Sequence, residues 1–144
     1  MTTGRSTDIK KVAEMMRDLD FCMFTTRTVT GGLHARPMSN NGEVEFDGDV
    51  WFFSGADTRK IEEIKADATV GLSYADTEQF RFISMNGRAA VVTDKTKKRE
   101  LWMTELERWF KDGPDSDDVV LIKVTPRAVA FWGGDGDGAI TLRE

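Results

Sequence analysis

Hydrophobic positions follow two different periods along the chain, and these periods predict helices in some segments and strands in others. Ile9, Val12, Met16 and Leu19 recur at helical spacing, after a polar stretch that can cap the first turn. Later segments carry β-branched and aromatic residues and end at glycine-rich or acidic turns, as strands do. This pattern predicts helices at residues 9–19, 57–66 and 94–110, and strands at residues 21–28, 33–40, 50–54, 69–75, 80–93, 119–125 and 128–132.

The order of these elements favours a mainly β fold with added helices. Most strands follow one another through short turns, so a closed or partly closed antiparallel barrel fits better than a doubly wound parallel sheet. Gly87 falls inside the longest predicted strand and predicts the bulge or bend that a barrel needs. We expect one domain over residues 1–144, with a flexible glycine-rich tail at residues 133–144.

Composition narrows the class of partner to a small molecule. Of the 144 residues, 31% are charged and the net charge is -5, which favours a soluble protein and argues against broad nucleic-acid binding. No apolar run approaches the roughly 20 residues of a membrane span, so we expect a cytoplasmic protein without membrane contact. Cys22 and His34 are the only residues of their kinds, which removes intrachain disulfides and the usual metal sites.

Residues 54–60 form the first candidate site. A predicted strand delivers the chain to a turn of small residues, and the predicted helix that follows starts with free backbone amides. Ser54 and Thr58 add hydroxyls there, while Arg59 and Lys60 add two adjacent positive charges. The segment therefore suits a phosphate group. A capped surface helix with solvated cations is the alternative, and the residues alone leave both interpretations open.

Two further features point to a ligand. Pro37 removes a backbone donor from a predicted strand, which indicates an edge or a bulge where Arg36 can turn toward a ligand. An ordinary exposed strand arginine is the alternative. Aromatic residues near the candidate anion site and near the last helix and strand, among them Phe53, Trp109 and Trp132, can form the walls around a planar cofactor. The alternative interpretation is that these aromatic residues belong to the hydrophobic core.

Several motifs occur in an order that is typical of a known family. Together with the apolar segment at residues 119–124, they resemble the pyridoxamine 5'-phosphate oxidase-like FMN-binding split barrels, in particular the general stress protein 26 branch. The resemblance covers roughly residues 9–132. The motifs are ARPM at residues 35–38, VWFFS at residues 50–54, TRK at residues 58–60, ELW at residues 100–102 and WFKDGPD at residues 109–115.

The resemblance implies an antiparallel split β-barrel that binds FMN at the interface of a homodimer. It also implies which residues meet the cofactor. The ring would lie against the backbone of Pro37, Met38 and Phe53, and Trp109 or Trp132 would close the site from the partner chain. The phosphate and ribityl contacts would come from Arg36, Ser54, Thr58, Arg59 and Lys60.

The C-terminal segment departs from the true pyridoxamine 5'-phosphate oxidases. There a tryptophan precedes an arginine-histidine-arginine cluster that grips the substrate phosphate, whereas Trp132 precedes glycines and aspartates and Arg143 stands alone. Acidic residues would repel such a phosphate. We therefore expect an FMN-dependent oxidoreductase with an unassigned substrate, no assigned catalytic side chain, and a small-molecule electron donor or acceptor. The alternatives are a non-catalytic flavin-binding stress protein, acting as a sensor, carrier or sink, and an F420-binding relative.

Overall fold

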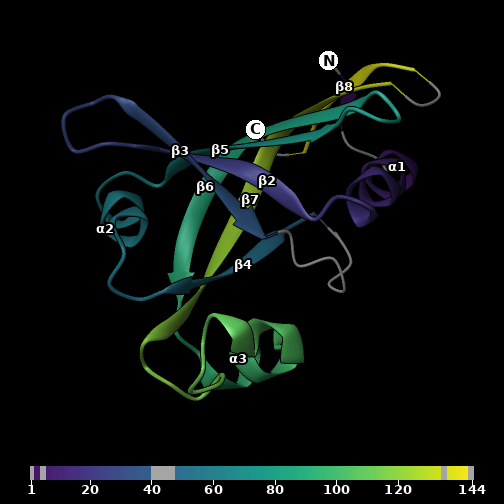
Figure 1. Cartoon of the computed structure of the whole chain (residues 1–144). Helices are drawn as coiled ribbons and strands as arrows, with labels where there is room; N and C mark the ends of the chain where they lie inside the picture. The colour runs from purple at the N-terminus through teal and green to yellow at the C-terminus, as the bar shows by residue number, and fades with distance from the viewer. Residues whose placement is uncertain (1, 4–5, 40–47, 134–135, 143–144) are drawn as a thin grey trace.

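A computed structural model of the chain describes residues 2–3, 6–39, 48–133 and 136–142. Figure 1 shows one sheet with helices packed around it. The helices are α1 (Ser6–Arg17), α2 (Arg59–Ala66) and α3 (Lys95–Leu101), followed by the 3-10 helix η1 (Thr104–Arg108). The strands are β1 (Thr2–Thr3), β2 (Phe21–Arg27), β3 (Leu33–Ser39), β4 (Val50–Gly55), β5 (Thr69–Asp76), β6 (Arg81–Val92), β7 (Val119–Trp132) and β8 (Gly138–Thr141).

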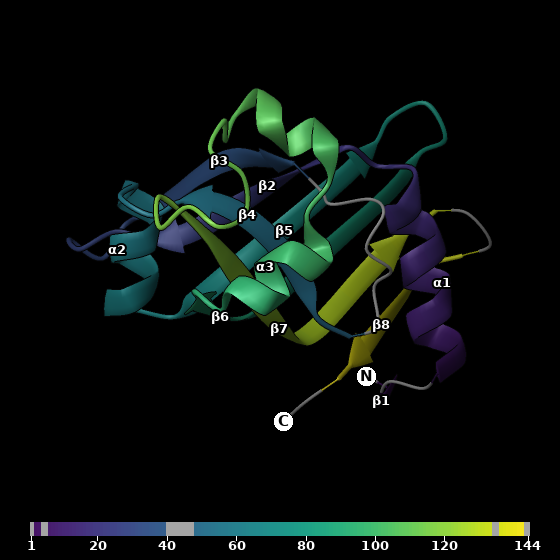
Figure 2. The ribbon, with the colours of Figure 1, turned by 90° about the horizontal axis from the view of Figure 1, so that it is seen from below.

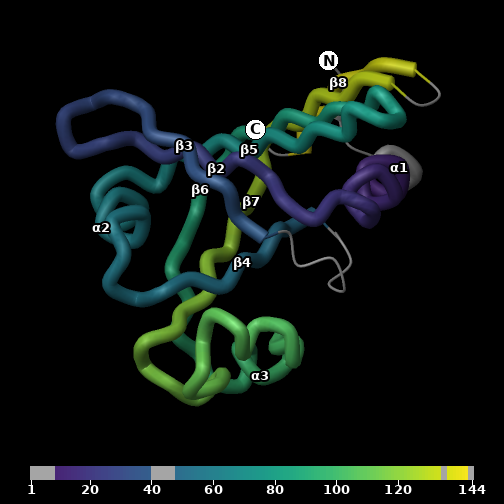
Figure 3. The backbone as a smooth tube through the Cα atoms, viewed as in Figure 1, coloured from purple at the N-terminus to yellow at the C-terminus, as the bar shows by residue number. Residues whose placement is uncertain are grey.

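The sheet has eight strands in the order β1-β8-β7-β6-β5-β2-β3, and β4 joins it by pairing with β7. All neighbours are antiparallel except β1 and β8, so the predicted mainly antiparallel sheet is confirmed. The strand pairs among the described residues do not close this sheet into a barrel, because β3 ends one path and β4 pairs with β7 alone. Figure 3 traces the chain from β4 into α2 and back into the sheet at β5.

The long strand β7 has different partners along its length. β6 pairs with one edge of β7, while β4 pairs with residues 119–124 and β8 with residues 128–131 on the opposite edge. The register shifts where Asn86 faces Ala128 and Gly87 faces Pro126, which confirms the predicted bulge at Gly87. We predicted two strands at residues 119–125 and 128–132, which is wrong. Pro126 cannot donate to the ladder, but at a bulge the strand continues through it.

Two further predictions, on the helix at residues 94–110 and on the tail at residues 133–144, differ from the structure. The helix predicted at residues 94–110 ends at Leu101, and Trp102 and Met103 have extended backbone before η1 begins. This break accompanies an edge-on contact between the Trp102 and Phe53 rings, whose centroids lie 5.2 Å apart. Within the tail that we expected to be flexible, residues 138–141 form β8, which pairs with β7 and buries Ile140.

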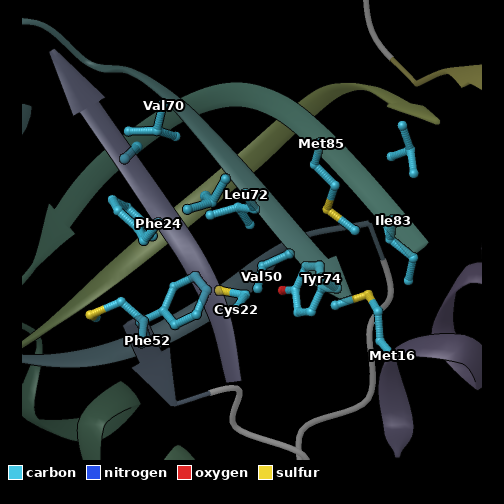
Figure 4. Close-up of a cluster of buried hydrophobic side chains, with 14 of the residues drawn as sticks. Met16, Cys22, Phe24, Val50, Phe52, Val70, Leu72, Tyr74, Ile83 and Met85 are labelled. Carbon is cyan, nitrogen blue, oxygen red and sulfur yellow. The ribbon is translucent and has the colours of Figure 1, made fainter. Parts of the chain in front are cut away.

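Strand β4 separates two hydrophobic clusters. Phe52 lies in the main cluster, where its ring meets Phe24 edge-on, and Phe53 lies in a second cluster beneath α3 and η1. Figure 4 shows the main cluster, including Cys22 beside Tyr74. Burial raises the pKa of the Cys22 thiol to about 12, so this thiol is a core residue rather than a nucleophile at neutral pH. Among the described residues, no helix has the length and apolar character needed to cross a membrane.

The bulge makes Gly87 sensitive to substitution. A Cβ added at Gly87 would lie 2.3 Å from the Thr125 carbonyl oxygen and 2.8 Å from the Pro126 Cα, both of which are backbone atoms. We expect Gly87→Ala to lower the free energy of unfolding by at least about 2 kcal/mol, because backbone atoms cannot move aside cheaply. Urea denaturation followed by circular dichroism measures this change.

Gly71 on the adjacent strand provides the control. A Cβ added there would meet no atom closer than 3.7 Å, so Gly71→Ala should leave the free energy of unfolding nearly unchanged. Equal effects of the two substitutions would contradict the steric explanation.

Candidate functional site

A groove of about 270 Å³ lies between the last residues of β3, the end of β4 and η1. Figure 2 shows the segment with α3 and η1 on the side of the sheet where β4 and β3 lie. The groove is lined by Phe21, Pro37, Met38, Ser39, Phe53, Ser54, Gly55, Lys60, Met103, Leu106, Trp109 and Phe110.

Most of the groove wall is apolar and aromatic. Met38, Phe53 and Leu106 are buried, and they form its inner surface. At its mouth the side chains of Phe21 and Trp109 are 57% and 58% exposed. Apolar and aromatic walls with few polar groups are typical of small-molecule sites, and they suit a flat ring system.

The polar end of the groove is the start of α2. Thr58 is the N-cap residue, but its side chain makes no capping hydrogen bond and instead donates to the carbonyl oxygen of Gly55 at 3.1 Å. The Ser54 and Thr58 hydroxyl oxygens lie 3.3 Å apart, and Lys60 Nζ donates to the Thr58 hydroxyl at 3.2 Å. The start of α2 thus combines a helix N-terminus without a side-chain cap, two hydroxyls and an ammonium group, which together suit an anion.

Among the residues that the structure describes, the contact of the Lys60 ammonium is the neutral Thr58 hydroxyl rather than a carboxylate. Burial of the side chain lowers the pKa of Lys60, and the positive charge of Arg36 lowers it further. A bound anion near this ammonium would act in the opposite direction. The electrostatics of this end of the groove therefore favour a negatively charged ligand over a neutral one.

Arg36 is held by a buried ion pair behind the groove. Its Nη2 donates to Glu63 Oε1 at 3.0 Å, and its Nη1 donates to the Thr26 hydroxyl at 2.8 Å. Thr26 in turn donates to the same Glu63 oxygen at 2.8 Å. The hydrogen bond from Thr26 is the main factor that lowers the pKa of Glu63, and Arg36 adds to this effect while burial opposes it. These contacts fasten α2 to the hairpin of β2 and β3.

The structure brings together most of the predicted site residues. Thr58 contacts the lining residues Ser54, Gly55 and Lys60, whereas the contacts of Arg36 are with residues outside the groove lining. Arg59 is exposed, and Trp132 pairs with Phe82 on β6, outside the groove of its own chain. Sequence reasoning did not single out Glu63 and Thr26, and nothing in the sequence distinguishes Glu63 from the exposed Glu62. The predicted residues that line the groove are Pro37, Met38, Phe53, Ser54, Lys60 and Trp109.

Comparison with known proteins matches residues 7–143 to the family model described as pyridoxamine 5'-phosphate oxidase like. The chain belongs to this family. The predicted resemblance to this family is therefore confirmed, and a general stress protein 26 is among the relatives that the chain matches.

Two relatives align with the chain over part of their own length. Protein bli-3 of Neurospora crassa is 27% identical over 125 residues, which is 81% of this chain and 60% of bli-3. General stress protein 26 of Bacillus subtilis is 30% identical over 89 residues, which is 60% of this chain and 63% of that protein. The chain thus spans less than two thirds of each relative.

Solved structures share the fold of this family member. A protein related to general stress protein 26 from Clostridium acetobutylicum superposes with a TM-score of 0.81 and 17% identity, covering 96% of both chains. A protein named F420 reductase gives a TM-score of 0.62 and 22% identity, covering 81% of this chain and 93% of that one. Because these identities are low, the likeness concerns the fold.

The ion pair behind the groove predicts how stability depends on pH. Glu63 has a lowered pKa in the folded chain, so its carboxylate stabilises the fold above the ordinary value of 4.5, and this contribution is lost as the pH falls through the lowered value. We expect Glu63→Gln to reduce the free energy of unfolding at neutral pH and to flatten its decline on acidification. Urea denaturation from neutral pH down to about pH 3 measures both changes.

Glu62→Gln is the matched control, because Glu62 is the exposed neighbour on the same helix. Its pH dependence should follow that of the unmodified chain. If Glu63→Gln declined with the same slope as the control, the ion pair would not be the source of the pH dependence.

Proposed function

We propose that the groove binds FMN and that the protein is a flavin-dependent oxidoreductase with a small-molecule electron donor or acceptor. The observation that carries this proposal is the meeting of an aromatic groove with a helix N-terminus that bears Lys60. FMN has the matching parts, a flat ring system at one end and a phosphate at the other. Membership of the pyridoxamine 5'-phosphate oxidase-like family supports the same cofactor.

The proposal assigns roles to residues along the groove. Lys60, the Ser54 and Thr58 hydroxyls and the first amides of α2 would hold the phosphate, with Arg36 and Arg59 adding positive charge. Pro37, Met38 and Phe53 would hold the ring. FMN, when bound, would supply the redox chemistry, while the protein supplies binding, orientation and exclusion of water. No side chain of the groove need donate or accept a proton for this role.

We propose further that the chain acts as a homodimer with the flavin at the interface. The exposed aromatic rings of Phe21 and Trp109 leave the mouth of the groove apolar, and a second copy would cover this surface. Trp132 is exposed and lies outside the groove of its own chain, and in this dimer it would approach the groove of the partner. In this arrangement the sheet would be a split barrel, with its opening between the edges of β3 and β4.

Two other functions remain in view for the same groove. The structural likeness to a protein named F420 reductase supports a deazaflavin in place of FMN. The relative named general stress protein 26 supports a stress role, in which the protein binds flavin without turnover. The mass and visible spectrum of the molecule that copurifies with the chain would separate FMN from F420.

The phosphate assignment predicts a specific loss in one variant. We expect Lys60→Met to weaken FMN binding by roughly tenfold, because a charge-assisted contact to the phosphate is removed. Riboflavin has the same ring without the phosphate, so its affinity should change little. Quenching of flavin fluorescence on titration measures both dissociation constants.

Lys65→Met is the matched control, since Lys65 is exposed in the last turn of α2. It should bind FMN like the unmodified chain. An unchanged FMN affinity in Lys60→Met would contradict the proposal that the phosphate binds at this end of the groove.

The oxidoreductase role predicts that bound flavin accepts electrons from a soluble donor. We expect anaerobic addition of NADH or NADPH to bleach the visible flavin band of the FMN-loaded protein, and oxygen or another acceptor to restore it. Stopped-flow absorbance measures both rates. Bound FMN that no donor reduces would favour the non-catalytic function instead.

A further inference from the structure

Lys98 is a charged residue inside the protein, far from the water that normally surrounds an ammonium group. It belongs to α3 and is 1% exposed. Its Nζ donates to the carbonyl oxygens of Ser116 and Val119, each at 2.9 Å. The side chain thus holds both ends of the short segment that leads into β7.

Burying an ammonium group is costly unless its donors are satisfied. The two carbonyl oxygens supply acceptors, and the positive charge of Lys98 is one of the factors that lower the pKa of Asp115, after the larger effect of Arg99. An apolar side chain of similar length could fill the same space. What the ammonium group adds is a pair of directional hydrogen bonds to Ser116 and Val119. These bonds fix the backbone position of residues 116–119 more closely than apolar packing would.

The segment held by Lys98 is attached to the turn at the polar end of the groove. Between the two carbonyls that Lys98 binds, the carbonyl oxygen of Asp118 accepts a hydrogen bond from the Ala56 amide at 2.8 Å. Next to it, Val119 pairs with Gly55 in the ladder of β7 and β4. Figure 2 shows the loop that enters β7 beside the end of β4.

Ser54 and Gly55 of the same turn line the groove, and Thr58 follows them in the chain. The carbonyl oxygen of Gly55 accepts from the Ser54 hydroxyl at 3.0 Å and from the Thr58 hydroxyl at 3.1 Å. Thr58 then accepts from Lys60. Hydrogen bonds joined by short stretches of backbone therefore connect Lys98, through residues 116–119 and the turn at Gly55 and Ala56, to the groups at the start of α2.

We propose that Lys98 is a positioning residue that sets the geometry of the phosphate-binding turn without touching the ligand. This inference rests on the proposed function, because it concerns the same groove. Removing the ammonium group would release residues 116–119 and shift the turn at Gly55 and Ala56. Contacts to a phosphate depend on that turn, whereas contacts to the ring depend on the apolar wall, so the two affinities should separate.

The test is the ratio of riboflavin to FMN dissociation constants in Lys98→Met. We expect this ratio to fall by roughly tenfold, through weaker FMN binding, while riboflavin affinity stays within about twofold. Replacing a buried charge by an apolar side chain of similar length need not destabilise the fold, which thermal denaturation would verify. Lys98→Gln, a shorter and neutral side chain, should lower the ratio in the same direction and carries the test if Lys98→Met does not fold.

Lys97→Met is the matched control, because Lys97 lies next in the chain and stacks on Trp51 instead of binding the loop. Its ratio should equal that of the unmodified chain. A Lys98 variant that folds and keeps the ratio, or that loses FMN and riboflavin affinity equally, would overturn the positioning role. If the unmodified chain bound FMN no better than riboflavin, the proposed phosphate site would be contradicted. That result would count against the proposed function and not against the positioning role of Lys98 alone.

Discussion

The bulge between β6 and β7 is the constraint on which the rest of the sheet depends. Arg127 is the additional residue on β7, because Asn86 faces Ala128 while Gly87 faces Pro126. The Thr125 carbonyl can approach Gly87 only because no side chain is present there. A bulge bends the strand and increases its twist. The two halves of β7 can therefore accept different partners, β4 on the first half and β8 on the second.

The position of β4 on the first half of β7 creates the groove. Within the described part of the chain β4 is not paired with β3, so the space between their ends is available to a ligand rather than to a ladder of hydrogen bonds. Because β4 has hydrophobic clusters on both faces, its successive residues Phe52 and Phe53 serve the core and the groove respectively. The turn after β4 then places Ser54 and the start of α2 at one end of that space.

The sequence predicts the elements whose signals are local. The hairpin of β2 and β3, the helix α2 and the bulge at Gly87 all follow from periodicity or from a single residue type. The break at Trp102 does not, because it occurs together with a ring contact to Phe53, which lies on a distant strand. The same is true of β8, since Ile140 is buried only where the tail meets β7. Tertiary contacts of this kind leave no periodic pattern in a short segment.

The same limit applies to charges at the groove. Glu62 and Glu63 are adjacent residues of the same type in one helix. Only the orientation of that helix against the sheet makes Glu63 the partner of Arg36. The candidate cations Arg36 and Lys60 likewise look equivalent in the sequence, yet their surroundings differ. Arg36 has a buried carboxylate within 3.0 Å, whereas the contact described for Lys60 is a neutral hydroxyl.

This difference supports the proposed preference of the groove for a phosphate. The ion pair with Glu63 satisfies Arg36 in the free protein, so binding a ligand there would first have to compete with an existing partner. Lys60 is partly desolvated, no carboxylate among the described residues pairs with it, and burial lowers its pKa, which means that its charged form is disfavoured there. An anion at the start of α2 would favour that form, while a neutral ligand in the same groove would not. Selectivity for a phosphorylated flavin over riboflavin would thus come from an uncompensated charge on α2, and the ion pair of Arg36 would keep the helix in place.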